Sequence, residues 1–220
     1  MKTLKTLIIH KFENLYMLFS ALVMSFVLLM IRIKLNKSFF YLFLVWNVFL
    51  AIIPYAITMY LSRIKLTKIK LSFGFCIWLL FLPNAPYIIT DLLHLKVSTT
   101  HMLWLDILVI SSFAITGMLL FFLSLNEMTT LLKQYLNKSY GSIIMTTVIF
   151  LCGFGVYLGR FLRYNSWEIL SNPNKLILDV MKMLFHPFEH SEVWLFTFGF
   201  GGFLFIVYSM FKKIYSLPST

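Results

Sequence analysis

An acidic residue and a histidine follow a proline-interrupted apolar segment near the middle of the chain. The segment FLPNAPYIIT (81–90) is followed closely by Asp91 and His94. If a helix continues to residue 101, the polar positions on one of its faces are Asp91, His94, Ser98 and His101. A carboxylate and an imidazole that converge on a cavity suit general acid–base catalysis or metal ligation. Asp91 and His94 are therefore candidate catalytic residues.

The same region also has a structural interpretation. Thr90 can cap a helix, Asp91 can stabilise the positive end of that helix, and the residues beyond can form a solvated loop. Asn84 has two compatible interpretations, because it can cap a helix that begins at Ala85 or offer its amide to a ligand. We predict that Asn84 and Tyr87 are binding residues beside the proline break.

Two of the four arginines, Arg160 and Arg163, lie together at the end of a later apolar run. The planar guanidinium group binds a carboxylate or phosphate through two parallel hydrogen bonds, which lysine cannot do. We predict a catalytic or ligand-binding role for both arginines, with anchoring at the membrane surface as the alternative. The candidate binding residues that follow them are Asn165, Ser166 and Trp167. Asn165 and Glu168 also fit a helix-capping pair, which would explain both without a ligand.

Asp106 lies one turn into the next apolar run and is a further candidate binding residue. A carboxylate at that depth is costly and usually has a partner. We expect Asp91 or Asp106 to lie within about 4 Å of Arg160 or Arg163, with His94 lining the same cavity.

The sequence does not predict a metal site or a particular cofactor. The pattern HPFEH (186–190) matches a zinc-peptidase motif, but Pro187 prevents a helix from holding both histidines on one face. Cys76 and Cys152 lie in apolar runs and are expected to be small buried hydrophobic residues. Gly155 and Gly159 have the spacing of a close contact between helices.

Composition places the chain in a lipid bilayer. Hydrophobic residues make up 60% of the sequence, charged residues 12%, and the mean hydropathy is +0.86. Soluble domains contain about 25% charged residues. The net charge of +11 comes from Lys and Arg in short segments between apolar runs, a pattern typical of membrane anchoring and of attraction to anionic lipid head groups. Nucleic acid is therefore not the expected partner.

The sequence predicts an all-α, polytopic bundle that forms a single integral membrane domain over residues 1–220. The six expected spans are approximately 15–31, 38–61, 71–90, 102–125, 139–159 and 193–211. Pro83 and Pro86 should break the third span near residues 82–86 and move Leu82 and Ala85 out of the helical region. Residues 175–185 have the charge pattern of an amphipathic helix, which either lies in the membrane interface or packs on the protein.

The distribution of basic residues favours a multi-pass cell-membrane protein with both termini in the cytoplasm. With the N-terminus inside, the inner segments hold eleven of the 19 Lys and Arg residues and the outer segments hold eight. Six spans also place segments 91–101 and 160–192 on the same face of the membrane. A site shared between these two segments is therefore possible in either orientation.

The segments FLPNAPYIITDLLHL (81–95) and GRFLRYNSWEIL (159–170) resemble the two signature segments of the bacterial membrane-protein family called domain of unknown function 1361. The resemblance implies a polytopic bacterial membrane protein and supplies no activity or substrate. Two functional classes are left open: a membrane-embedded enzyme or a protein that binds lipid or an anionic ligand, and a small transporter or channel component. An accessory subunit without catalysis is a third possibility, and the oligomeric state is not predicted.

Overall fold

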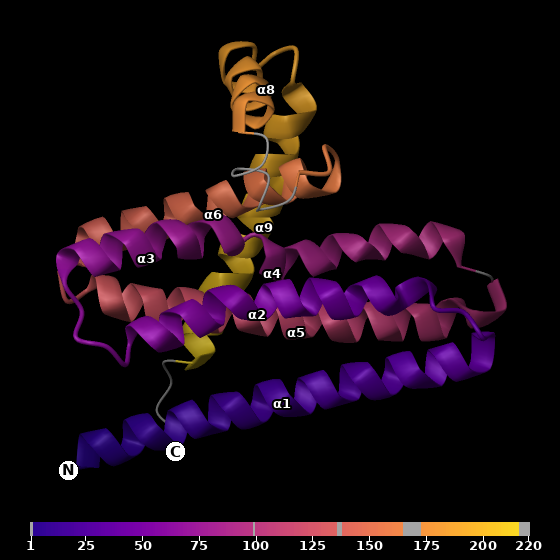
Figure 1. The fold of residues 1–220 in the computed structure, drawn as a ribbon, viewed down its shortest axis with the longest axis horizontal. Helices are drawn as coiled ribbons and strands as arrows, with labels where there is room; N and C mark the ends of the chain where they lie inside the picture. Colours follow the sequence, from indigo (N-terminus) through magenta and orange to yellow (C-terminus); the bar gives the residue numbers. More distant parts are fainter. Residues whose placement is uncertain (1, 99, 136–137, 165–172, 216–220) are drawn as a thin grey trace.

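The computed structural model describes residues 2–98, 100–135, 138–164 and 173–215, and every regular element in these ranges is a helix. Figure 1 shows the order of the elements. They are α1 (Lys2–Asn36), η1 (Phe40–Leu42), α2 (Phe43–Leu61), α3 (Lys68–Phe81), α4 (Asn84–Tyr87), η2 (Ile88–Val97), η3 (Thr100–Met102), α5 (Leu103–Leu132), α6 (Lys138–Arg160), α8 (Pro173–Phe185) and α9 (Ser191–Tyr215). The predicted all-α fold is confirmed.

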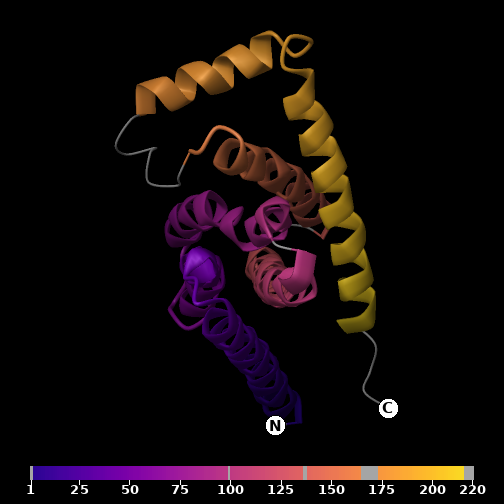
Figure 2. The ribbon, with the colours of Figure 1, turned by 90° about the vertical axis from the view of Figure 1, so that its right-hand side faces the viewer.

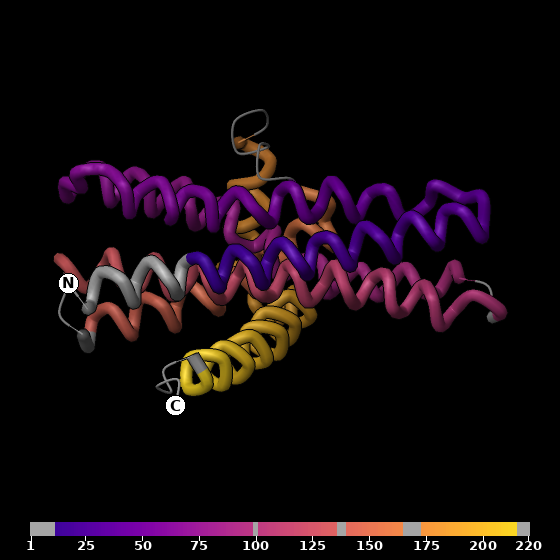
Figure 3. Tube along the Cα trace, turned by 90° about the horizontal axis from the view of Figure 1, so that it is seen from below, coloured from indigo at the N-terminus to yellow at the C-terminus, as the bar shows by residue number. Residues whose placement is uncertain are grey.

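Six segments of the described chain are long and apolar enough to cross a membrane, in agreement with the predicted spans. They are Phe12–Asn36, Phe40–Leu61, Lys68–Val97, Leu103–Leu132, Tyr140–Arg160 and Ser191–Ile214. Helix α5 is the most buried of them and packs against α1, α2 and η2. Figure 2 looks along the bundle and shows α5 within the cluster of long helices, and Figure 3 shows α1 running beside it.

The third candidate span is broken where the prolines predict. Helix α3 ends at Phe81, and α4 begins at Asn84 and passes into the 3₁₀ helix η2. Because Pro86 has no N–H group, the carbonyl of Leu82 accepts from Ala85 N–H at 3.2 Å instead. The Asn84 side-chain amide donates to the carbonyl of Phe81 at 2.9 Å. The missing proline donors therefore account for the break.

One part of the predicted cause is wrong. Leu82 keeps right-handed helical angles, φ −56° and ψ −39°, and Ala85 lies inside α4. The residues before the two prolines thus do not leave the helical region. The chain instead tightens from α-helical to 3₁₀ geometry, which brings donors from three residues away to the orphaned carbonyls.

Glycines allow neighbouring helices to approach α4 from two sides. A Cβ atom at Gly117 of α5 would lie 2.5 Å from the Ala85 carbonyl oxygen, and one at Gly155 of α6 would lie 2.6 Å from Pro83 Cγ. A Cβ atom at Gly159 would lie 3.3 Å from the Tyr87 ring. The predicted close contact through Gly155 and Gly159 is confirmed, and it brings the end of α6 to the proline break.

The last two helices leave the direction of the bundle. Helix α9 crosses α6 obliquely (Figures 1 and 2), and Gly153 and Gly201 lie where the two backbones are close. Helix α8 lies outside the bundle and across its direction (Figure 2). Apolar residues of α8 such as Ile177, Leu178 and Phe185 are exposed, as expected for an amphipathic helix. Its placement in a membrane interface stays a prediction.

Candidate functional site

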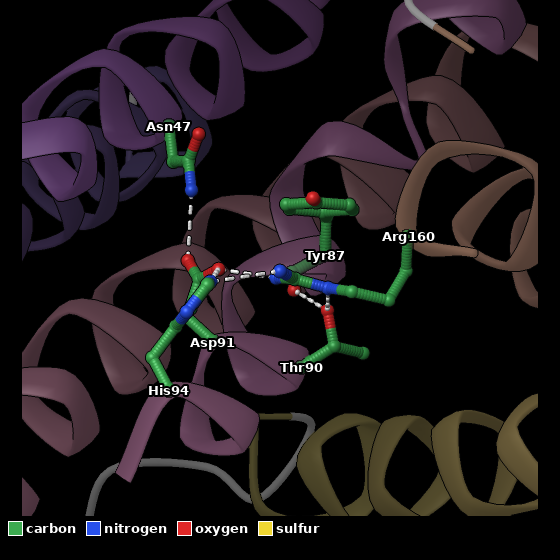
Figure 4. A network of polar contacts seen from close by, with 6 residues as sticks. All are labelled: Asn47, Tyr87, Thr90, Asp91, His94 and Arg160. Carbon is green, nitrogen blue, oxygen red and sulfur yellow. Dashed lines mark hydrogen bonds and ion pairs between the residues drawn. The ribbon is translucent and has the colours of Figure 1, made fainter. Parts of the chain in front are cut away.

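The end of α6 meets the beginning of η2 through the side chain of Arg160. Arg160 Nε donates to Thr90 Oγ1 at 2.7 Å, and Nη2 forms a short ion pair with Asp91 Oδ1. Nη1 lies 3.1 Å from His94 Nε2. Three nitrogens of one guanidinium group therefore contact three residues from two successive turns of the 3₁₀ helix η2 (Figure 4). We call the following six residues the Arg160 network: Arg160, Thr90, Asp91, His94, Asn47 and Tyr87.

The 3₁₀ geometry of η2 explains why these contacts come from one side of the helix. Residues three apart eclipse one another in a 3₁₀ helix, so Asp91 and His94 lie above one another on the same side. Thr90 lies beside them and donates its hydroxyl proton to the Tyr87 carbonyl at 2.6 Å, which leaves its oxygen to accept from Arg160. The proline break upstream thus sets the local geometry of the site.

The contact with Arg160 fixes the protonation of His94. A guanidinium nitrogen can only donate, so His94 Nε2 must accept and carries no proton. The imidazole is then neutral with its proton on Nδ1. His94 Nε2 is also 3.9 Å from Asp91 Oδ1, too far for a hydrogen bond. His94 therefore serves as an acceptor for Arg160, and Asp91 is paired with the guanidinium.

Asp91 is completely buried, with 0% of its surface exposed. Its second oxygen, Oδ2, accepts from Asn47 Nδ2 of α2 at 2.8 Å. An unpaired carboxylate in this position would cost several kcal/mol. Each oxygen of Asp91 therefore has a donor, one from Asn47 of α2 and one from Arg160 of α6. These two contacts also connect α2, η2 and α6.

Tyr87 covers the guanidinium from one side. The Arg160 Cζ atom lies 4.2 Å from the centre of the Tyr87 ring, within the range of a cation–π contact (Figure 4). Gly159 lies against the same ring, and Tyr87 is also one of the residues that line a neighbouring cavity. Tyr87 therefore connects the network to the cavity that lies beside it.

This cavity, which we call the central pocket, has a volume of about 160 Å³ and lies at the proline break. Its polar and aromatic lining comes from Trp46, Asn47, Asn84, Tyr87 and Tyr164. Leu176 of α8 also lines it, and Tyr164 hydroxyl donates to Asp179 of the same helix at 2.6 Å. Helix α8 is therefore attached at the edge of the pocket.

A second buried ion pair lies in a separate cluster. Arg32 Nε donates to Asp106 Oδ1 at 2.7 Å, and Asp106 Oδ2 accepts from Ser98 hydroxyl at 2.5 Å and from Tyr41 hydroxyl at 3.1 Å. Arg32 and Asp106 are 6% and 0% exposed. We call Arg32, Asp106, Ser98 and Tyr41 the Arg32 network. It joins α1, η1, the residue that follows η2, and α5.

The structure brings together some of the predicted site residues. The expected pairing of a carboxylate with a span-ending arginine is confirmed by Asp91 and Arg160. His94 joins Asp91 and Arg160 in the network, and it is not among the residues that line the central pocket. Asn84 and Tyr87 do line the pocket. Asn84 is the first residue of α4, and its side-chain amide donates to the carbonyl of Phe81.

Other predicted residues lie elsewhere. Asp106 belongs to the Arg32 network, because the start of α5 packs against α1. Arg163 is exposed and adopts φ 60° in the turn after α6, so it does not share the position of Arg160. Asn165, Ser166 and Trp167 lie outside the described residues. The predicted polar stripe divides, since Ser98 is in extended conformation and donates to Asp106, and His101 is exposed.

Sequence reasoning missed four functional partners and misjudged a cysteine. Asn47, Thr90 and Tyr41 are polar groups inside or beside spans. Their position in apolar segments could have indicated that each has a hydrogen-bond partner. Arg32, expected to anchor a span end, is buried instead. Cys152 is buried as expected, whereas Cys76 is exposed.

The model of the family described as protein of unknown function (DUF1361) matches residues 46–207. The chain belongs to this family. All members of the Arg160 network and the lining of the central pocket lie within the matched range, whereas Arg32 and Tyr41 precede it. No curated protein and no solved structure matches the chain.

Among the described residues of this DUF1361 protein, no group of three or more His, Cys, Asp and Glu side chains is arranged to hold a metal ion. The two ion pairs instead consist of carboxylates with arginines. What the geometry supports is a multi-span membrane protein with a buried Asp–Arg–His network beside a small pocket.

Proposed function

We propose that this protein binds a membrane amphiphile whose uncharged, hydroxyl-bearing head group enters the central pocket. The observation that carries the proposal is the pocket itself, at a break in a membrane-span candidate and lined by two asparagine amides and three aromatic rings. Broken backbone at membrane depth is tolerated where it is buried in protein or lines a cavity. Small-molecule sites are typically apolar cavities with a few placed polar groups.

The charge of Arg160 supports an uncharged ligand over an anionic one. Asp91 offsets the positive charge by a direct ion pair, and Thr90 and His94 accept from the other two nitrogens. A phosphate would have to compete with a buried carboxylate that would then lose its partner, a loss of about 3–5 kcal/mol. The network therefore acts as a rigid, neutral wall behind Tyr87.

The pocket lining matches hydroxyl groups in hydrogen-bonding capacity. Amide side chains both donate and accept, as hydroxyl groups do, and phenols add a further donor and acceptor. Figure 4 shows the Asn47 carbonyl oxygen pointing away from Asp91, to which its nitrogen is bound. The rings of Trp46, Tyr87 and Tyr164 supply apolar faces for the carbon skeleton of such a head group.

Binding is better supported than catalysis. A general base needs an accessible lone pair aimed at the substrate. Asp91 is fully buried with both oxygens occupied, and His94 Nε2 accepts from Arg160. Asp91 and His94, the residues predicted to carry out acid–base chemistry, are thus both held by Arg160.

Lipid exchange into nanodiscs tests the proposal. The purified full chain would be placed in discs that contain a glucosyl diacylglycerol or a phosphatidic acid with the same acyl chains, and retained lipid would be measured by native mass spectrometry. We expect preferential retention of the glucolipid. Asn84→Leu should weaken it about tenfold, the value of one or two lost hydrogen bonds, and Tyr164→Phe should weaken it less.

Matched controls are Asn126→Leu and Tyr140→Phe, which change the same residue types outside the pocket. Both should retain the glucolipid as the wild type does. Equal retention of phosphatidic acid, or equal effects of Asn84→Leu and Asn126→Leu, would overturn the proposal.

A further inference from the structure

A second, larger depression lies between α2 and α3, away from the central pocket along the same two helices. Its volume is about 630 Å³, and the ten residues that line it lie between Ile53 and Ile64 and between Lys70 and Ile77. The central pocket instead contacts Trp46–Leu50 at the other end of α2. We call the second depression the α2–α3 groove.

The α2–α3 groove has the shape and chemistry of an acyl-chain site. Ile53, Ala56, Ile57 and Ile77 give it aliphatic walls, and Gly74 adds no side chain. A Cβ atom at Gly74 would lie 2.8 Å from Leu61 Cδ1, so α3 rests directly on α2 at this point. Both helices are candidate membrane spans. An open groove between them would therefore face lipid.

Basic residues surround one end of this groove. Lys70 lines it, and Lys68 lines a neighbouring apolar depression on the other side of α3. Arg63 and Lys65 lie in the connection from α2 to α3, and all four side chains are exposed. Segment 62–90 contains no Asp or Glu, so nothing within it offsets these charges.

Aromatic rings mark the level at which a head group would lie. Tyr60 and Phe73 line the groove and are 64% and 69% exposed. Amphipathic aromatic residues gather at the boundary between hydrocarbon and head groups, and Lys at that boundary attracts anionic lipid. Apolar walls and a cluster of basic side chains thus meet at the same end of one groove.

We infer that the α2–α3 groove is a binding site for an anionic phospholipid, with one acyl chain between α2 and α3 and the phosphate beside Lys70. The site differs from the central pocket in the charge that it selects. The connection between α2 and α3 provides further attraction through Arg63 and Lys65, without a need for direct contact.

Nanodiscs that contain phosphatidylglycerol or phosphatidylcholine with identical acyl chains test the inference. Lipid that remains on the full chain after detergent washing would be counted by native mass spectrometry. We expect retention of phosphatidylglycerol over phosphatidylcholine. Lys70→Gln should weaken it about fivefold, which corresponds to about 1 kcal/mol for one basic residue near an anionic surface. Ala56→Phe, which fills the groove from an exposed position, should remove it.

The matched control is Lys34→Gln, which changes an exposed lysine in the last turn of the first span. It should leave retention unchanged, and circular dichroism would establish that each variant is folded. Equal losses from Lys70→Gln and Lys34→Gln would show diffuse charge only and overturn the inference. So would unchanged retention in Ala56→Phe. Asn84→Leu should not affect phosphatidylglycerol, which separates this site from the central pocket.

Discussion

Arg160 is the residue on which most of the polar contacts in the site depend. Its guanidinium group donates to Thr90, His94 and Asp91 and lies on the Tyr87 ring. Its side chain is only 11% exposed, so solvent cannot replace these contacts. The planar, forked shape of arginine is what allows three directions of donation at once.

Arg160→Lys should destabilise the fold by about 1–3 kcal/mol, because an ammonium group keeps the charge but cannot reach all three acceptors. Thermal unfolding in detergent would measure the change. Arg163→Lys is the matched control, since Arg163 is exposed, and it should stay within about 0.5 kcal/mol of the wild type. Similar effects of the two substitutions would show that Arg160 acts only as a membrane anchor.

At the scale of elements, α4 is the part that positions the site. It is four residues long, contacts α2, α5 and α6, and begins the 3₁₀ geometry that continues in η2. Gly117 and Gly155 permit the approach of α5 and α6. The Asn84 amide donates to the carbonyl of Phe81, because the Ala85 N–H that would bond it in a continuous α-helix donates to Leu82 instead. The break is thus fixed by packing on both sides.

Gly117→Ala should weaken this packing, because its Cβ atom would lie 2.5 Å from a backbone oxygen of Ala85 that cannot rotate away. We expect a loss of about 1–3 kcal/mol, typical of overpacking, in chemical denaturation. In Gly199→Ala the added Cβ atom meets nothing within 4 Å, and the better helix propensity of alanine should leave stability equal or higher. If Gly117→Ala were as stable as Gly199→Ala, the close contact of α4 and α5 would be disproved.

At the scale of the whole molecule, the direction in which each long helix runs decides which connections lie at the same end of the bundle. The connection from α1 to α2 contributes Tyr41 and the segment from η2 to α5 contributes Ser98, and both donate to Asp106 in one cluster. The connection from α2 to α3 begins after Leu61, at the other end of α2. Which end faces the cytoplasm stays a prediction from the distribution of basic residues.

Cysteine labelling in intact cells would test that orientation. In a chain with Cys76 and Cys152 replaced by alanine, His101→Cys should react with a membrane-impermeant maleimide. Arg63→Cys should react only after the cells are permeabilised, because the basic segment that contains it is expected to be cytoplasmic. The reverse pattern would invert the topology, and labelling at both positions would contradict a span between them.

The sequence by itself determined the features that depend on local chemistry. Six apolar segments, the break at Pro83 and Pro86, and the close approach at Gly155 and Gly159 all follow from hydropathy, missing donors and missing side chains. The need of a buried carboxylate for a partner also predicted that Asp91 or Asp106 would meet Arg160 or Arg163, and Asp91 pairs with Arg160. None of these statements requires knowledge of how the helices are arranged.

Only the tertiary structure decided which partner each charged group has. Asp106 pairs with Arg32 and Asp91 with Arg160, because helix packing and rotation bring these side chains together across 74 and 69 residues. Asn47 reaches Asp91 from α2 for the same reason. A pairing energy depends on distance and direction between elements, and local sequence patterns contain neither.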